Sequence, residues 1–351
     1  MVSNVGSPAG VEQLQCDLIQ FLTSAPILDA EGNLYSWVNW TDPEHVGYVY
    51  PEGMGLYLTL MSQLAASRKD AAMAECATRV AGRLQDIMHP SGGIGIHGQL
   101  YPFDVCMAIK GLLTFQGELN GHINPGVLAR MAHFVVDMGD RRLTIMNEDG
   151  GLPEVAPTWS TAFGASMLKE VIALDALYLE TGEERYRAMV DQVADEVIAT
   201  CYKDGSFHVI PQDSSVYTHP NCYALEGLLH LRARGYRDTT ELLHAGSDQL
   251  CDWQKADGSL YNWHNATPER QAAKRKVGDA SAQAIRIWFA VDSEAYRPQI
   301  ERGLSFLVDL QSPQKGLYYA DDSTDVNSIT SIFAAQALEW YLHGVRADAI
   351  A

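Results

Sequence analysis

Three aspartates occupy corresponding places in this sequence of 351 residues, each at the start of an apolar, helix-like stretch. They are Asp104, Asp279 and Asp325, and His219 stands at the start of a fourth such stretch. Two carboxyl groups in different surroundings can serve as proton donor and proton acceptor, and a histidine can act as a base or orient a carboxyl group. We therefore predict acid/base chemistry at these residues. Alternatively, each Asp only caps its helix, because its carboxylate accepts hydrogen bonds from free N–H groups of the first turn.

Two loop residues fall at equivalent places in the sequence. Glu154 lies three residues after Gly151, and His208 lies three residues after Gly205. Equivalent loops of a closed ring face the same end of it, so both side chains are further candidates for acid/base work. The alternative for each is an ordinary solvated loop residue.

Aromatic side chains gather near the same glycine-containing loops, where they could bind a substrate. Flat rings contact the apolar faces of sugars, and they also stabilise carbocations through the ring quadrupole. The candidates are Trp37, Trp40, Tyr101, Trp159, Tyr217, Trp263 and Tyr318. A basic cluster that includes Lys274 and Arg275 predicts an anionic group, such as a uronate or a diphosphate, near these rings. Alternatively, that cluster is a solvated loop.

A six-fold internal repeat positions these residues. A short motif, which we call the glycine phrase, recurs at intervals of 53 to 61 residues. Its glycines are Gly32, Gly93, Gly151, Gly205, Gly258 and Gly316. Each phrase opens a loop that leads into a helix-like stretch rich in small and apolar residues, which is typical of a buried helix. Short β-like phrases in the loops, 34–38, 206–210 and 317–320, could pair as small hairpins.

Two kinds of predicted helix alternate along the chain. The buried kind starts near residues 52, 104, 160, 219, 279 and 325, and the amphipathic kind covers 11–24, 68–88, 126–139, 183–201, 238–254 and 294–311. Six buried and six half-exposed helices predict an all-α (α/α)6 toroid, with an inner ring inside an outer ring, as one domain over residues 1–351. Closure requires the helix near 11–24 to pack against the helix near 325–343. An open solenoid is the alternative.

Several phrases resemble known toroid families. Phe306–Gln311 followed by Gly316-Leu317-Tyr318 resembles the glutamine–tryptophan repeat of terpenoid cyclases, and Thr158–Ala162 with Leu177–Tyr186 resembles the six-hairpin glycosidases. The whole chain is similar to such toroids, to protein prenyltransferases, and above all to uncharacterised toroid proteins of bacterial exopolysaccharide gene clusters. This resemblance implies an (α/α)6 fold and a role in polysaccharide metabolism.

Two patterns in the sequence could indicate a metal site. Asp321–Asp325 matches the D-D-x-x-D pattern that binds magnesium and diphosphate in isoprenoid enzymes, and Asp104, Cys106 and His219 resemble the zinc ligands of prenyltransferases. The first lies before a helix instead of inside one, and the second spreads over non-adjacent repeats. There is no phosphate-binding glycine loop and no H-E-x-x-H. We therefore predict no metal and no cofactor.

Composition excludes several classes of partner. The chain has 25 basic and 44 acidic residues, which gives a net charge of −19. This charge argues against nucleic acid and against an anionic membrane surface. No apolar run is long enough to span a membrane, and no signal-type segment opens the chain, so we expect a cytoplasmic protein. The six cysteines are expected to be buried, reduced thiols. The oligomeric state stays open.

The function predicted from the sequence is acid/base chemistry on an oligo- or polysaccharide, with uronate-containing chains among the candidates, by hydrolysis, elimination or epimerisation. The first alternative is a terpenoid cyclase or prenyltransferase, which requires a cavity walled almost wholly by apolar side chains. The second is a glycan-binding or assembly protein without catalysis, which requires a shallow cleft with no pair of carboxyl groups.

Overall fold

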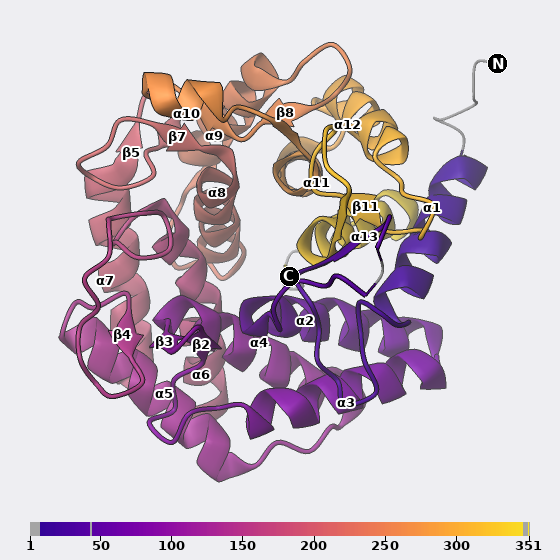
Figure 1. Ribbon diagram of the computed structural model, residues 1–351. Helices are drawn as coiled ribbons and strands as arrows, with labels where there is room; N and C mark the ends of the chain where they lie inside the picture. The colour runs from indigo at the N-terminus through magenta and orange to yellow at the C-terminus, as the bar shows by residue number, and fades with distance from the viewer. Residues whose placement is uncertain (1–7, 43, 347–349, 351) are drawn as a thin grey trace.

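Two concentric rings of helices make up the fold (Figure 1). The computed structural model describes residues 8–42, 44–346 and 350. The inner ring consists of α2 (Pro51–Arg68), α4 (Pro102–Leu119), the 3-10 helix η1 (Ala165–Glu170) continued by α6 (Val171–Thr181), α8 (Thr218–Ala233), α11 (Gly278–Asp292) and α13 (Ser328–His343). The outer ring consists of α1 (Pro8–Leu22), α3 (Ala71–Asp86), α5 (Pro125–Asp140), α7 (Glu184–Cys201), α9 (Thr240–Trp253) and α12 (Arg297–Asp309). The predicted (α/α)6 toroid is confirmed.

Inner and outer helices differ in how many of their faces are buried, as the sequence pattern predicts. In α2 every residue from Pro51 to Ala65 is buried. In the outer helix α3 the buried residues are instead spaced three or four apart, from Met73 to Leu84, and form a single face. A helix that is apolar on every face must pack against other elements on every face, whereas an amphipathic helix packs on one face only.

The ring closes between the first and the last helix, as the toroid requires. Gln15 of α1 donates a hydrogen bond to Glu339 of α13, with Nε2 and Oε2 2.5 Å apart. Strand β1 (Trp37–Asn39) also pairs antiparallel with β12 (Asp325–Asn327). The open solenoid is therefore wrong.

At several repeats the glycine turn packs closely against the next outer helix. Gly92 and Gly258 have φ values of +93° and +88°, in the left-handed region that favours glycine. A Cβ atom on Gly92 would lie 2.1 Å from the carbonyl oxygen of Arg130 in α5. On Gly258 it would lie 1.9 Å from that of Arg302 in α12. Both the turn and the approach to the helix therefore require glycine.

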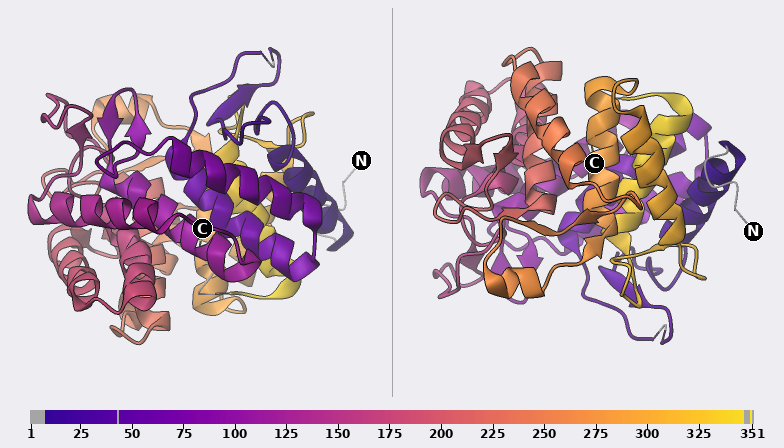
Figure 2. Two further views of the ribbon diagram at one scale, coloured as in Figure 1. Left: turned by 90° about the horizontal axis from the view of Figure 1, so that it is seen from below. Right: turned by 90° about the horizontal axis from the view of Figure 1, so that it is seen from above.

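Short strands and loops gather at the end of the ring where the inner helices begin (Figure 2). They include the predicted β-like phrases, which form parts of β1, β6 and β11. The remaining elements are β2 (Gly95–Ile96), β3 (Gln99–Leu100), β4 (Met146–Asn147), β5 (Tyr202–Lys203), β6 (Ser206–Phe207), β7 (Val216–Tyr217), β8 (Leu260–Tyr261), β9 (Trp263–His264), α10 (Pro268–Ala272), β10 (Lys276–Val277) and β11 (Leu317–Tyr318). These loops cover the entrance to the centre of the ring.

Two predicted helix starts are wrong. The inner helix expected near residue 160 begins instead with η1 at Ala165. Asp325 belongs to strand β12, and α13 begins three residues later at Ser328. The capping residue is Asn327, whose side chain accepts a hydrogen bond from Thr330 N–H at 2.8 Å. Asn and Asp cap helices about equally well, and the sequence offers both here.

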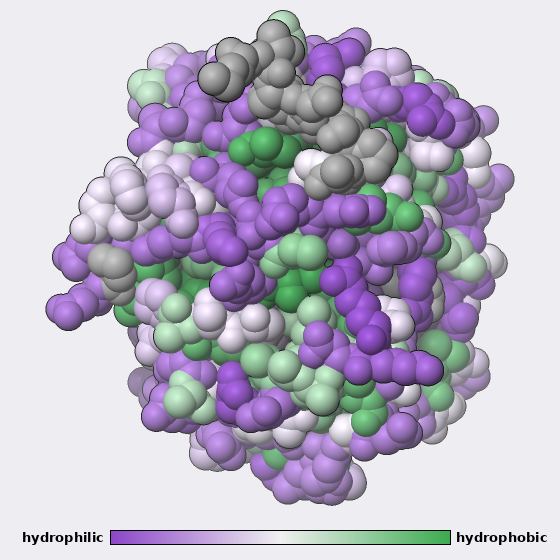
Figure 3. Space-filling view, turned by 90° about the vertical axis from the view of Figure 1, so that its right-hand side faces the viewer, coloured by the Kyte–Doolittle hydropathy of each residue, from purple (hydrophilic) through white to green (hydrophobic). Residues whose placement is uncertain are grey.

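The face of the molecule seen in Figure 3 is mainly polar. On the face seen in Figure 3, apolar side chains lie scattered among hydrophilic ones. In the ranges that the structure describes, no helix combines the length and the apolar character needed to cross a membrane.

Candidate active site

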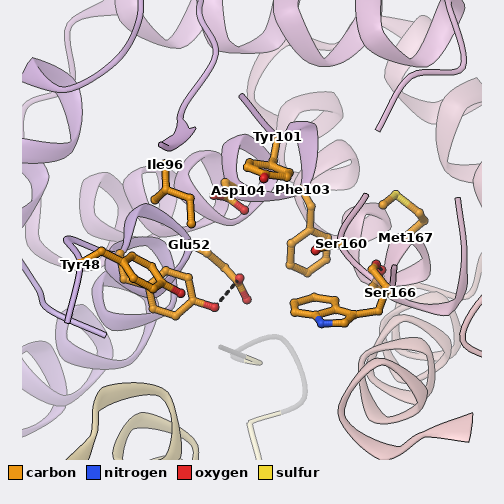
Figure 4. A pocket seen from close by; sticks show the side chains of 11 residues that line it. Tyr48, Glu52, Ile96, Tyr101, Phe103, Asp104, Ser160, Ser166 and Met167 are labelled. Carbon is orange, nitrogen blue, oxygen red and sulfur yellow. Dashed lines mark hydrogen bonds between the residues drawn. The ribbon is translucent and has the colours of Figure 1, made fainter. Parts of the chain in front are cut away.

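A cavity opens at the end of the ring where the inner helices begin, and we call it the mouth cavity (Figure 4). Its volume is about 510 Å³, counting the part that is open to solvent. Side chains from α2, α4, η1 and the neighbouring loops form its wall: Tyr48, Tyr50, Glu52, Ile96, Tyr101, Phe103, Asp104, Trp159, Ser160, Ser166 and Met167. Glu52 and Asp104 lie on one side of it, and Ser166 and Met167 lie on the other (Figure 4).

The repeat explains why polar side chains meet at this end. Glu52, Ser166, His219 and Asp279 are each the second residue of an inner helix, and Asp104 is the third residue of α4. Equivalent positions in a closed ring face the same end, so residues far apart in the sequence come together. His219 adjoins the mouth cavity, because its ring centroid lies 5.6 Å from that of Trp159 in the cavity wall.

Asp104 is buried beside a second carboxyl group. Glu52 accepts hydrogen bonds from Tyr50 to Oε2 and from Tyr223 to Oε1, both at 2.7 Å. Burial raises the pKa of Glu52, and the two phenols oppose this rise. Burial, and then the charge of Glu52, raise the pKa of Asp104 well above its usual range. Burial and the neighbouring carboxylate thus favour the protonated form of Asp104, which makes it the candidate proton donor.

Asp104 and Asp279 are not N-cap residues. Tyr101 precedes α4 and Val277 precedes α11, and neither makes a side-chain capping bond. The Oδ1 atom of Asp279 accepts a hydrogen bond from Ala280 N–H at 2.7 Å, yet burial still raises the pKa of Asp279 to about 7. Capping alone does not account for these two carboxyl groups.

His219 is held in one tautomer by a chain of hydrogen bonds. Its Nδ1 lies 2.7 Å from Oε1 of Gln283, and Nε2 of Gln283 donates to Oε1 of Glu226 at 3.3 Å. An ionised carboxylate only accepts hydrogen bonds, so the amide nitrogen of Gln283 faces Glu226 and its oxygen faces His219. The proton of the neutral imidazole therefore sits on Nδ1, which leaves the lone pair on Nε2.

Burial keeps His219 neutral. It lowers the pKa of His219 to about 3, and the positive charges of Lys169 and Arg286 act in the same direction. Among the described residues, Nε2 of His219 has no hydrogen-bond partner, so it is free to accept a proton from a substrate. The Oδ2 atom of Asp279 lies 3.5 Å from Nδ1 and could stabilise the imidazolium that would form.

Below the mouth cavity lies a group of buried charges, which we call the charged floor. Glu226 and Arg286 each come seven residues, about two helical turns, after His219 and Asp279. Glu226 contacts Lys169, with Oε2 and Nζ 2.8 Å apart, and it also pairs with Arg286. All three side chains are only 1% exposed. Each charge is thus paired, as buried charges must be.

The structure brings four of the seven predicted aromatic residues to this end of the ring. Tyr101 and Trp159 line the mouth cavity. Tyr217 stacks on Trp263 with ring centroids 4.4 Å apart, and Trp159 and Trp263 both line an adjoining hollow. These rings offer flat faces beside the acid/base groups.

The other three aromatic residues line none of the cavities described in this article. Trp37 packs edge-on against His45 with ring centroids 5.0 Å apart, and Trp40 is 38% exposed. Tyr318 is half-buried in β11. These three residues lie near glycine phrases in the sequence. That position does not determine whether a loop side chain faces a cavity.

The basic cluster does not reach the mouth cavity. Arg275 donates a hydrogen bond from Nε to Oδ1 of Asp322 at 2.7 Å. The Nζ atom of Lys274 lies 4.4 Å from the ring centroid of Tyr261. Neither cation lines the mouth cavity, so the prediction that they meet an anion there gains no support.

Three predicted acid/base residues also lie away from the cavity. Asp325 accepts a hydrogen bond from Nδ2 of Asn39 at 3.0 Å, within the β1–β12 pair. Glu154 is exposed on its loop. His208 is half-buried, and burial lowers its pKa. The structure therefore places Asp104 in the cavity wall and His219 beside it, and leaves Asp325, Glu154 and His208 away from the cavity.

Neither metal pattern gains support from the geometry. Within the part of the chain that the structure describes, no three His, Cys, Asp or Glu side chains are grouped so that they could hold a metal ion. Burial raises the pKa of the Cys106 thiol well above its usual range, whereas metal binding requires the thiolate. In the Asp321–Asp325 run, Asp322 pairs with Arg275.

Several residues of the site were missed in the sequence. Glu52 follows Pro51 at a helix start, just as Asp104 follows Pro102, and this parallel was available. Gln283 and the charged floor lie inside apolar runs. The only signal for them was a polar residue about two turns into an inner helix, and such a residue does not reveal its partners.

The sequence matches no protein-family model and no curated protein sequence. Solved structures nevertheless share its fold over nearly the whole chain. A sugar epimerase from a ruminal bacterium aligns with a TM-score of 0.75 at 12% identity, over 97% of this chain and 99% of the other. Cellobiose 2-epimerase from Spirochaeta thermophila aligns with a TM-score of 0.73 at 14% identity, over 95% and 99%.

A third similar structure is an unsaturated glucuronyl hydrolase specific for heparin. It aligns with a TM-score of 0.69 at 10% identity, over 95% of this chain and 96% of the other. The predicted resemblance to sugar-active six-hairpin toroids is therefore confirmed at the level of the fold. Fold does not determine function, so any activity of this chain must be argued from its own site.

Proposed function

We propose that this protein is an enzyme that epimerises or isomerises a neutral sugar by proton transfer in the mouth cavity. One observation carries the proposal: a buried carboxyl group and a buried imidazole meet at one cavity, since Asp104 and Trp159 line it and His219 lies against Trp159. Burial raises the pKa of Asp104, which favours a proton donor, and lowers the pKa of His219, which favours a proton acceptor. Such a pair is what general acid/base catalysis requires.

The wall of the cavity favours a sugar over a terpenoid. Carboxyl, hydroxyl and phenol groups stand among the aromatic rings, at Asp104, Ser160, Ser166 and Tyr101. A carbocation cyclase would need an almost wholly apolar wall. A purely binding protein would gain nothing from carboxyl groups that are costly to bury. The similar solved structures, two sugar epimerases and a glucuronyl hydrolase, support the same substrate class.

Protonation states favour epimerisation or isomerisation over hydrolysis. A glycosidase needs an ionised carboxylate opposite a protonated one. The pKa values of Asp104 and Asp279 are both raised, and both oxygens of Glu52 accept hydrogen bonds from tyrosines. The free base is the imidazole of His219.

The engaged cations favour a neutral substrate. An elimination on a uronate would need a positive group near the sugar carboxylate, whereas Arg275 pairs with Asp322 and Lys274 lies over Tyr261. The buried Lys169 and Arg286 are paired with Glu226.

In the proposed reaction, Nε2 of His219 removes the proton from the carbon next to the carbonyl group of an open-chain sugar. Asp104 donates its proton to the carbonyl oxygen, so that a neutral enediol forms. Asp279 stabilises the imidazolium of His219. If the enediol turns about the bond to the next carbon, so that its other face meets His219, return of the proton from Nε2 to the same carbon gives the epimer and restores the neutral imidazole. Return to the neighbouring carbon gives the isomer, and in either case Asp104 recovers its proton from the enediol oxygen. Gln283 positions His219 throughout.

The test is turnover of a panel of neutral aldoses, ketoses and disaccharides, followed by NMR. Asp104→Asn should lower the rate by about 10²- to 10⁴-fold, the usual scale of acid/base assistance. Asp325→Asn is the matched control, because Asp325 lies outside the cavity, and it should keep the parental rate. Equal rates for the two variants would contradict the role of Asp104. Turnover of uronates alone would contradict the neutral substrate.

A further inference from the structure

A second cavity lies away from the mouth, between the outer helices α5 and α7 and against η1. We call it the lateral cavity. Its volume is about 740 Å³, counting the part that is open to solvent. Met138, Met189 and Phe163 form much of its apolar wall, and Met167 separates it from the mouth cavity, since Met167 lines both. Glu170 at the end of η1 also lines it.

The carboxyl group of Glu170 is buried in this apolar wall without a partner. Glu170 is 8% exposed, and among the described residues its Oε1 atom has no hydrogen-bond partner. An unsatisfied buried polar group costs about 1–3 kcal/mol. An apolar residue of similar size would avoid this cost, and the retention of a costly group is typical of functional sites. Burial also raises the pKa of Glu170 to about 8.

The surroundings of Glu170 indicate the charge of the missing partner. Asp140, Glu196 and Arg142 also line the lateral cavity, and Arg142 already pairs with Glu196, with Nη1 and Oε1 3.6 Å apart. The charged residues of the cavity are therefore acidic on balance, and the whole chain carries a net charge of −19. Such a field attracts cations and repels anions.

We propose that the lateral cavity binds a small apolar amine, whose ammonium group pairs with Glu170 and whose apolar body packs between the methionines and Phe163. Methionine side chains adapt to irregular apolar shapes, and an aromatic ring attracts a neighbouring cation through its quadrupole. The site is separate from the acid/base groups of the mouth, so the proposal does not depend on the proposed sugar chemistry.

Binding of the amine should release one proton from Glu170 to the buffer. At pH 7 the free site holds a protonated Glu170 and the ligand is an ammonium ion. Pairing of the two charges ionises the carboxyl group, and its proton leaves to the buffer. A neutral ligand of the same shape would release no proton. The heat of binding should therefore depend on the ionisation enthalpy of the buffer for the amine only.

The experiment is calorimetric titration of the full chain at pH 7 with benzylamine and with benzyl alcohol, in phosphate and in Tris. We expect one bound benzylamine, at least ten-fold tighter than benzyl alcohol, with release of close to one proton. Glu170→Gln keeps the shape and should abolish both the preference and the proton release. Met189→Trp, which fills the cavity, should weaken both ligands.

Two outcomes would overturn the proposal. One is equal affinity for the amine and the alcohol in the parent protein. The other is an amine preference that persists in Glu170→Gln, which would place the amine elsewhere on this acidic chain. Circular dichroism of each variant shows whether it is folded, and the comparison of two ligands in the parent stands even if a variant fails to fold.

Discussion

The mouth cavity and the charged floor both bury ionisable groups in the same ring of helices. The two regions differ in whether each group has an opposite charge beside it. In the floor, Glu226 lies between Lys169 and Arg286, and every charge has an opposite charge beside it. At the mouth, Asp104 and Asp279 are almost as deeply buried, at 8% and 6% exposure, and neither has a cation as partner. Paired charges stay ionised, whereas unpaired buried carboxyl groups keep their protons.

This difference separates a structural role from a chemical one. The enclosed ion pairs hold three parts of the ring together, η1, α8 and α11, and their side chains are only 1% exposed. Groups that titrate near neutral pH inside an accessible cavity can give and take protons during a reaction. The floor also acts on the mouth, because Glu226 orients Gln283, and Gln283 fixes the tautomer of His219.

The largest expected effect comes from breaking the floor. Glu226→Leu leaves two buried cations without their carboxylate, so we expect the free energy of unfolding to fall by about 3–5 kcal/mol. Urea denaturation measures this. The control is Asp104→Asn, which removes an equally buried carboxyl group from the mouth and should change stability by less than about 1 kcal/mol. Similar losses in both variants would erase the distinction between the two regions.

A smaller effect should appear in the pH dependence of stability. The native pKa of Asp279 is raised from 3.8 to about 7, so between these values the native state holds a proton that the unfolded chain has released. The free energy of unfolding therefore falls as pH rises from about 4 to 7. Asp279→Asn should flatten this fall by about 2–4 kcal/mol, since one pKa unit corresponds to about 1.4 kcal/mol. Thermal melts between pH 4 and 8 give the slope of this free energy against pH. The same slope in the variant and the parent would contradict the raised pKa of Asp279.

The smallest effect is expected at the basic cluster. Arg275→Ala removes an ion pair in which the side chains are 36% and 63% exposed. Exposed pairs contribute about 0–1 kcal/mol, so stability should barely change. The rate of sugar turnover should also stay near the parental value, because Arg275 lies outside the mouth cavity. A large rise in KM would restore Arg275 as a substrate-binding residue.

The fold could be predicted because its signals are local and repeated. Helix periodicity and a turn glycine recur six times, and at Gly92 and Gly258 the backbone of the next outer helix leaves no room for a side chain. Closure of the ring followed from the number of repeats. The exact start of α13 could not be predicted, since Asp325 and Asn327 are both suitable caps.

The candidate site was predictable only where the repeat places residues on helices. Asp104, His219 and Asp279 converge because they occupy the same turn of neighbouring inner helices. Loop residues such as Glu154 and Arg275 did not converge, since the side of a loop on which a side chain lies depends on partners distant in the sequence. The same holds for Glu226, whose two cations come from η1 and α11.

The central claim is that His219 removes a carbon-bound proton from a sugar, and incubation in D₂O tests it most directly. Proton NMR of a substrate identified in the panel should show loss of the signal of the carbon next to the carbonyl group as deuterium replaces that proton. His219→Asn should abolish this exchange while remaining folded. Products formed without any deuterium at that carbon, or exchange that persists in His219→Asn, would contradict the account.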